Sequence, residues 1–141
     1  MILNEAALQY WHNKFNQMFF NNELEPAIIK IFPHDEFNDY GIEANFISVT
    51  DPFLIQFHYD VSESDNIYTL TVLLHEMVHQ HCLENNIEDM DEEDKHTKDF
   101  IFEGENHGLS QGYFLQTQAE ERIKEELKKY DSISSVGEVF T

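Results

Sequence analysis

The sequence predicts an α+β domain, in which one helix is followed by a small three-stranded sheet and then by further helices. Apolar residues recur at helical spacing near the start, short strand-like runs lie between residues 27 and 60, and longer helical patterns follow residue 65. No internal repeat and no Gly-, Ser- or Pro-rich linker marks a second domain. The 141 residues are therefore assigned to one domain over 1–130, followed by a flexible tail at 131–141.

The first helix is predicted from its apolar residues. Leu8, Trp11 and Phe15 recur every three or four positions, which places them on one face of a helix. Asn4 precedes this pattern and is a good N-cap residue. The polar segment NNELEP at 21–26 is expected to end the helix.

Three strands are expected between the first and second helices. The runs are AIIKIF (27–32), IEANFISV (42–49) and FLIQFHYD (53–60), all rich in β-branched or aromatic residues. In the last run, alternate positions are apolar, which is typical of a strand with one buried face. A turn is predicted at 33–41, which ends at Gly41.

Further helices are predicted after the strands. Residues 67–85 form a long apolar pattern, and Ser64 or Asp65 is expected to cap it. Residues 95–108 predict a short helix that its glycines stop. Residues 117–130 predict an amphipathic helix rich in Glu and Lys.

The charge balance excludes several classes of partner. Eight Lys+Arg stand against 28 Asp+Glu, which gives a formal net charge of -20. Such a surface repels phosphate backbones and anionic lipids, so direct nucleic-acid or membrane binding is not expected. One cysteine excludes an internal disulfide framework. The N-terminus lacks signal-peptide features and no apolar run has membrane-spanning length, so the expected location is the cytoplasm.

A metal-binding pattern lies in the predicted helix over 67–85. The segment TVLLHEMVHQH contains His75-Glu76-Met77-Val78-His79, which matches H-E-x-x-H. Residues four apart share one helix face, so two imidazoles there can bind one zinc ion at about 2.0–2.1 Å. Glu76 is placed to take a proton from a water molecule that the metal activates.

Two neighbours of this motif do not fit the same metal. His81 lies two residues beyond His79, about 200° around the helix, and is expected to face away. Cys82 lies on the face of His75, but about 10 Å further along the axis. We therefore expect Cys82 to be a small buried residue.

The third ligand must come from outside the motif. The downstream candidates are Glu92, Glu93, His96, Glu103 and His107. His96 lies 17 residues beyond His79, after the acidic connector and at the start of the next predicted helix. It is the favoured candidate, because the residue closest to the turn can best reach back. Glu103 or a glutamate of the connector is the alternative.

These segments resemble a known family. LTVLLHEMVHQH followed by DKHTKDFIFEGENHG is similar to the SprT-like zinc metalloproteases, the group that includes Spartan. The family shows L-L-H-E-h-h-H, where h is apolar, and then a further His with an aromatic residue beyond it. FNQMFFNNELEPAIIKIF is similar to the helix, Leu and strand that precede this motif in the family. The resemblance covers roughly residues 8–110.

The resemblance implies a zincin-like fold with a small sheet beside the metal-binding helix. It also implies a zinc ion held by His75, His79 and His96, with Glu76 as the general base and a peptide or protein as substrate. Thr97 stands where the family usually has Gly, and no Cys-rich zinc ribbon follows. Because the chain is strongly acidic, the family's DNA-linked role is not expected here.

The hypothesis that follows is metal-assisted hydrolysis of a peptide bond. His107 or Tyr113 is a candidate donor to the oxyanion, and an edge strand at 41–47 or 53–60 could hold an extended peptide. Two alternatives are a zinc-stabilised binding module without catalysis and an acidic interaction protein that mimics DNA. The sequence indicates neither the cleavage preference nor the oligomeric state.

Overall fold

The computed structural model describes residues 3–32, 43–62 and 64–140, with the backbone alone for Ser62 and residues 131–140. Over these residues the chain forms five helices, a three-stranded sheet and a two-stranded ladder, so the predicted α+β class is confirmed. The predicted turn at 33–41 lies outside the described residues. The elements are α1 (Glu5–Phe20), β1 (Ala27–Phe32), β2 (Ala44–Ile47), β3 (Phe53–His58), α2 (Tyr59–Ser62), α3 (Asn66–Glu84), α4 (Lys98–Glu105), β4 (Leu109–Ser110), β5 (Phe114–Leu115) and α5 (Thr117–Phe140).

Helix α1 follows the sequence prediction closely. The Asn4 side chain accepts a hydrogen bond from the backbone N–H of Ala7 at 2.8 Å, which caps the first turn. The helix ends where Asn21 adopts a left-handed conformation, with φ of 54°. Trp11 and Phe15 are fully buried. This apolar face of α1 forms one wall of the core.

The sheet is mixed, with strand order β1-β3-β2. β1 runs parallel to β3 and β2 runs antiparallel to it. β3 is therefore the central strand, and its Ile55 and Phe57 are fully buried. The third strand is two residues shorter than predicted, because Tyr59 and Asp60 begin α2. Because β3 is paired on both sides, it offers no free edge to a peptide. Of the two strands predicted to hold a peptide, 41–47 and 53–60, only the first, which contains β2, lies at an edge of the sheet.

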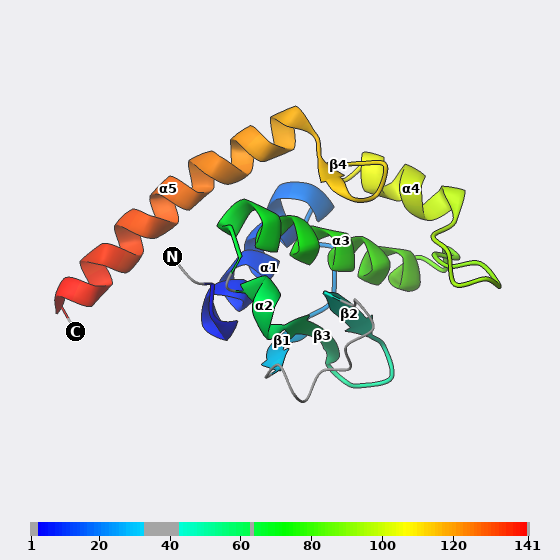
Figure 1. Ribbon diagram of the computed structural model, residues 1–141, viewed down its shortest axis with the longest axis horizontal. Coiled ribbons are helices and arrows are strands. Elements are labelled where there is room, and N and C mark those ends of the chain that lie inside the picture. The colour runs from blue at the N-terminus through cyan, green and yellow to red at the C-terminus, as the bar shows by residue number, and fades with distance from the viewer. Residues whose placement is uncertain (1–2, 33–42, 63, 141) are drawn as a thin grey trace.

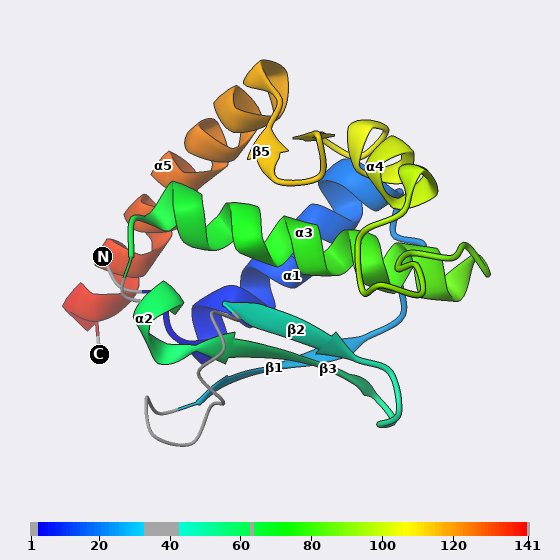
Figure 2. The same cartoon turned by 45° about the vertical axis from the view of Figure 1, so that its right-hand side comes forward.

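Helix α3 packs against α1 and β2 and carries the metal-binding pattern (Figures 1 and 2). Asp65 caps it by accepting a hydrogen bond from the backbone N–H of Tyr68. Leu70, Leu73 and Met77 are fully buried against the core. Figure 2 shows α3 crossing in front of α1, with the sheet lying below both helices. The core between these layers therefore fixes the position of α3 relative to α1 and the sheet.

The C-terminal half adds α4, the β4–β5 ladder and α5. α4 begins after Thr97, whose hydroxyl accepts a hydrogen bond from the N–H of Phe100 at 3.0 Å. α5 extends to Phe140, so residues 131–140 are helical where a loose tail was predicted. Figure 1 shows α5 running from the region of β4 to the end of the molecule where both termini are marked. Among the helices of the described residues, none combines the length and the apolar content that a membrane span requires.

Candidate metal centre

The structure brings together the three predicted histidine ligands. His75 and His79 lie one turn apart on α3, and His96 reaches them from the segment before α4. One ligand atom from each residue lies within 4.8 Å of the others. We call His75, His79 and His96 the first histidine group.

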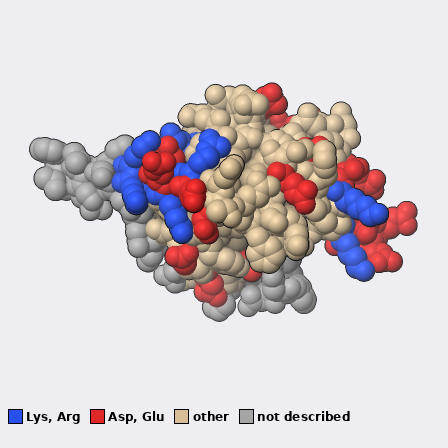
Figure 3. Space-filling view, turned by 90° about the horizontal axis from the view of Figure 1, so that it is seen from above, with Lys and Arg blue, Asp and Glu red and all other residues tan. Residues whose placement is uncertain are grey.

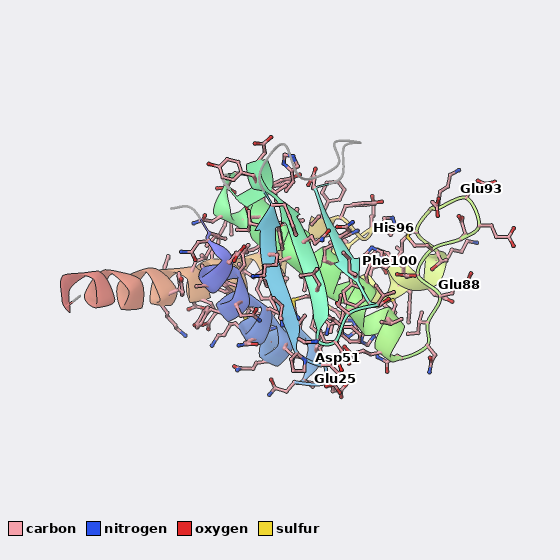
Figure 4. All side chains as sticks on the ribbon, turned by 90° about the horizontal axis from the view of Figure 1, so that it is seen from below. Glu25, Asp51, Glu88, Glu93, His96 and Phe100 are labelled. Atoms are coloured by element: carbon pink, nitrogen blue, oxygen red, sulfur yellow. The ribbon has the colours of Figure 1, made fainter. Side chains whose placement is uncertain are left out.

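The connector between α3 and α4 positions His96. Met90 and His96 form an isolated antiparallel bridge, and the N–H of Thr97 donates to the carbonyl oxygen of Asp89 at 2.9 Å. The Thr97 hydroxyl donates to the carbonyl oxygen of Glu88 at 2.7 Å. His96 is thus held in a closed loop before the helix, and not in its first turn as predicted. Figure 4 shows His96 beside Phe100, at the base of this loop.

Each histidine of the group is oriented through its Nδ1 atom. His75 Nδ1 donates to the carbonyl oxygen of Gly112 at 2.5 Å, and His79 Nδ1 donates to Asp89 Oδ2 at 2.7 Å. Neither acceptor can donate, so both Nδ1 atoms carry the ring hydrogen and both Nε2 atoms carry a lone pair. His96 Nδ1 contacts the Tyr113 hydroxyl at 2.7 Å. Metal-binding histidines are typically held in this way.

The Nε2 atoms then face one another. His79 Nε2 and His96 Nε2 are 3.2 Å apart. Without an ion, His96 Nε2 can donate to the lone pair of His79 Nε2 while Tyr113 donates to His96 Nδ1. With an ion, the hydrogen of His96 moves to Nδ1 and both Nε2 atoms are free to bind it. Tetrahedral zinc with bonds of about 2.0–2.1 Å separates its ligand atoms by about 3.3 Å, so the observed spacing suits such an ion. The residues therefore fit the metal that the motif predicts.

Phe100 forms an apolar wall beside the group. Its ring stacks on His79 and His96, with centroids 4.3 and 4.5 Å apart, and it meets His75 edge-on at 5.1 Å. Phe100 is fully buried. This ring fixes the planes of the imidazoles and keeps water away from that side of the group.

Burial also sets the protonation states around the group. It lowers the pKa of His75 to about 4, and it lowers the pKa values of His79 and His96. The rings are therefore neutral at pH 7, which is the form that binds a metal. Burial raises the pKa of Glu76 to about 8, although its carboxylate accepts a hydrogen bond from the backbone N–H of Phe46. A dication beside Glu76 would favour the ionised form again.

A pocket of about 670 Å³ opens over the group, between β2 and α3. Glu76 and all three histidines line it, and the exposed rings of Tyr68, Tyr113 and Phe114 stand around it. Tyr68 also donates a hydrogen bond to Glu43. The complete lining is Glu43, Ala44, Asn45, Phe46, Tyr68, Thr71, Val72, His75, Glu76, His79, Asp89, Met90, His96, Tyr113 and Phe114.

The other predicted candidates lie elsewhere. His81 contacts Glu103 and His107, and we call these three residues the second histidine group. Glu103 is therefore not a ligand of the first group. His107 packs on Phe20 and does not line the pocket, so the prediction that it faces the substrate is corrected. The reason is that α4 begins at Lys98 and ends at Glu105, so neither His96 nor His107 lies on this helix and the two do not share a helix face.

His81 and Cys82 behave as the sequence predicted. His81 faces away from the first group. Cys82 is fully buried, and burial raises the pKa of its thiol to about 12, so it is an inert core residue.

Sequence reasoning missed the residues that orient the ligands. Asp89 is one of several carboxylates in the acidic connector, and nothing in the sequence distinguishes it from Asp91 or Glu92. Gly112 acts through its backbone oxygen, which no residue pattern indicates. The only available signal was the aromatic Phe100 four positions beyond His96, which the family resemblance includes.

No protein-family model, curated protein or solved structure matches this chain. The resemblance to the SprT-like family therefore rests on the motif segments alone. The geometry of the first histidine group is an independent observation, and it supports a metal site without reference to any family.

Proposed function

We propose that this protein is a zinc-dependent metallopeptidase with a zincin-like fold. The observation that carries the proposal is the convergence of three histidine rings, with one ligand atom each within 4.8 Å of the others, in a pocket that Glu76 also lines. Structural zinc sites usually have four protein ligands, whereas catalytic sites have three and leave one position for water or substrate. The three histidines, with the pocket above them, correspond to the catalytic arrangement.

Glu76 is the proposed general base. When bound, zinc supplies Lewis acidity that allows water to ionise near neutral pH. The Glu76 carboxylate accepts the proton of the attacking water and later delivers it to the nitrogen of the leaving amine. The Phe46 N–H holds this carboxylate at the pocket wall, so proton transfer needs no large side-chain movement. The three histidines hold the ion and take no part in the proton transfer.

The proposed substrate is an extended peptide segment. β2 pairs with β3 along one edge, and residues 44–46 of β2 line the pocket. A substrate strand could pair with the opposite edge of β2 and pass over Glu76. Tyr113 lies 2.7 Å from His96 Nδ1, which must donate to the tyrosine oxygen if Nε2 binds zinc. The Tyr113 hydrogen then remains available for a substrate oxygen, which keeps Tyr113 as a candidate donor.

The alternative function as an acidic interaction protein is less well supported. A DNA mimic needs a face on which acidic side chains dominate. On the face that Figure 3 shows, Lys and Arg side chains lie among Asp and Glu at two ends, and mostly uncharged residues with a few carboxylates lie between them, so this face is not dominated by acidic side chains. A non-catalytic zinc module would share the ligands of a peptidase, and activity measurements distinguish the two.

The test separates metal binding from hydrolysis. Glu76→Gln should retain about one zinc ion at the first histidine group and lose hydrolysis of unfolded casein by at least about 100-fold. His96→Ala should lose both the ion and the activity. Metal content is measured by mass spectrometry and cleavage by release of fluorescent peptides.

The control is Glu92→Gln, which makes the same change at an exposed position of the connector. It should match the unmodified protein in both measurements. Full activity of Glu76→Gln would refute its role as the base. Zinc binding without cleavage by the unmodified protein would favour the non-catalytic module.

A further inference from the structure

The second histidine group lies on the same pair of helices as the first. His81 is on α3, Glu103 is on α4 and His107 follows the end of α4. Their potential ligand atoms lie within 4.8 Å of one another. His81 Nε2 lies 2.9 Å from Glu103 Oε2, and the rings of His81 and His107 have centroids 4.3 Å apart. Two imidazoles and a carboxylate form a donor set that binds zinc and similar divalent ions.

One hydrogen bond fixes the tautomer of His107, whose Nδ1 atom also lies 4.0 Å from Glu103 Oε2. Its Nδ1 atom lies 2.6 Å from the carbonyl oxygen of Glu103, which can only accept. The ring hydrogen is therefore on Nδ1, and the lone pair is on Nε2. This is the same use of a backbone carbonyl that orients His75 in the first group. Burial lowers the pKa of His107, so its ring is neutral at pH 7.

His81 must change its tautomer before it can bind an ion through Nε2. Asn85 Nδ2 donates to the carbonyl oxygen of His81 at 2.9 Å and lies 3.3 Å from His81 Nδ1. This arrangement places the ring hydrogen on Nε2, where it is donated to Glu103. Binding of an ion at Nε2 requires the hydrogen to move to Nδ1. Asn85 is exposed, so its amide can turn and present Oδ1 to that hydrogen.

The surroundings shelter the group from bulk water. Phe20 stacks on His107, with centroids 4.6 Å apart, and its ring also lies 5.7 Å from His81. The side chains of His81, Glu103 and His107 are only 12%, 18% and 15% exposed. A sheltered carboxylate in a chain of net charge -20 attracts a cation more strongly than an exposed one does.

We propose that His81, Glu103 and His107 form a second site for a divalent transition-metal ion of the zinc class. The ion braces α3 against the end of α4. Because His75 and His79 lie on α3 and His96 lies directly before α4, this brace fixes the spacing on which the first histidine group depends. The proposal does not rest on peptidase activity.

The test is titration of the metal-free full-length protein with Co²⁺, followed by visible absorption. The unmodified protein should bind two equivalents. Glu103→Gln should bind one, because Gln keeps an acceptor for His81 but loses the charged ligand. His96→Ala should also bind one equivalent, and its absorption spectrum should differ from that of Glu103→Gln.

The results distinguish the two sites. Suppose that the unmodified protein binds one equivalent of Co²⁺, that His96→Ala binds none and that Glu103→Gln still binds one. This result overturns the second site. If instead the single equivalent of Co²⁺ still binds to His96→Ala and no longer binds to Glu103→Gln, the second site is supported. The proposed peptidase then loses its basis, because the first histidine group binds no ion. Circular dichroism checks folding. His107→Phe, which keeps the stacking on Phe20, replaces Glu103→Gln if that variant does not fold, and it should also bind one equivalent.

Discussion

At the scale of single residues, the orientation of the histidine rings determines the chemistry of the first group. The Nδ1 partners of His75 and His79 are a backbone carbonyl of the β4–β5 turn and a carboxylate of the connector. Each partner fixes a ring hydrogen and so leaves a lone pair on Nε2. These bonds make metal affinity depend on residues that do not touch the metal.

Asp89→Asn should weaken zinc binding by about 10- to 100-fold, because it removes the charged acceptor that holds His79 Nδ1. The affinity is measured by competition with a chromophoric chelator. Glu92→Gln removes one charge from the same connector and should leave the affinity unchanged. Equal affinities in the two variants would show that Asp89 contributes only to the overall charge.

At the scale of elements, the short β4–β5 turn connects the core to the first histidine group. Gly112 has φ of +84°, and a Cβ atom there would lie 3.2 Å from the ring of Phe100. Its carbonyl also accepts the hydrogen bond from His75. Glycine is therefore required here both for backbone conformation and for close packing.

Gly112→Ala should lower the free energy of unfolding by about 1–3 kcal/mol, because the left-handed conformation is strained for alanine. It should also weaken zinc binding by displacing the carbonyl that holds His75. Gly104→Ala is the control, since its Cβ would meet only ordinary contacts at 3.6 Å and beyond. Urea unfolding with a chelator present measures stability, and the prediction fails if both variants lose the same amount.

The packing of α1 against α3 includes a buried histidine. His12 is 1% exposed, and its Nε2 atom lies 3.0 Å from Gln80 Oε1. Gln80 Nε2 donates to the carbonyl oxygen of Glu25 and to Glu84, so its Oε1 atom accepts from His12. Burial lowers the pKa of His12 below the 6.5 of an unfolded chain. Below pH 6.5, the unfolded chain therefore binds a proton that the folded chain resists.

The His12 contribution to stability should be present above pH 6.5 and decrease as the pH falls towards the folded pKa. His12→Gln keeps a donor to Gln80 but does not titrate, so its unfolding free energy should fall less between pH 7 and 5. Urea unfolding at several pH values, with a chelator present, compares the two proteins. Parallel pH profiles would contradict the assignment.

At the scale of the whole molecule, the net charge opposes compactness. Twenty excess negative charges lie on a chain of 141 residues, and several of them crowd the connector beside the first histidine group. This repulsion acts at long range, so dissolved ions screen it. The same field favours a bound dication at either histidine group.

Raising the salt concentration from 10 to 150 mM NaCl should raise the melting temperature of the metal-free protein at pH 7. The screening length falls from about 30 to about 8 Å, which weakens the self-repulsion more than the close ion pairs. Differential scanning calorimetry measures the shift. A lower melting temperature would mean that surface ion pairs, such as Lys14–Glu126 at 3.3 Å, outweigh the repulsion. Matched ionic strength in sodium sulfate separates screening from specific chloride binding.

Local patterns predicted most of the fold and the members of the first histidine group. The α1 cap at Asn4, the three strands and the grouping of His75 with His79 follow from side-chain spacing within one element. The α3 cap is Asp65, one of the two residues that the sequence offered. His96 was also predicted, because a residue close to the turn after α3 can reach back. The caps, strands and the His75–His79 pair depend on residues close together in the chain. The position of His96 is restricted by the short connector that joins it to α3.

The sequence by itself determined the α+β class, the H-E-x-x-H helix and the acidic surface, because each depends on residue type and spacing along the chain. Only the tertiary structure decided that β3 is central, that His107 joins His81 and Glu103, and that Asp89 and Gly112 orient the ligands. Those facts depend on where α4 begins and on backbone atoms that meet across distant segments. Side-chain periodicity carries no information about either.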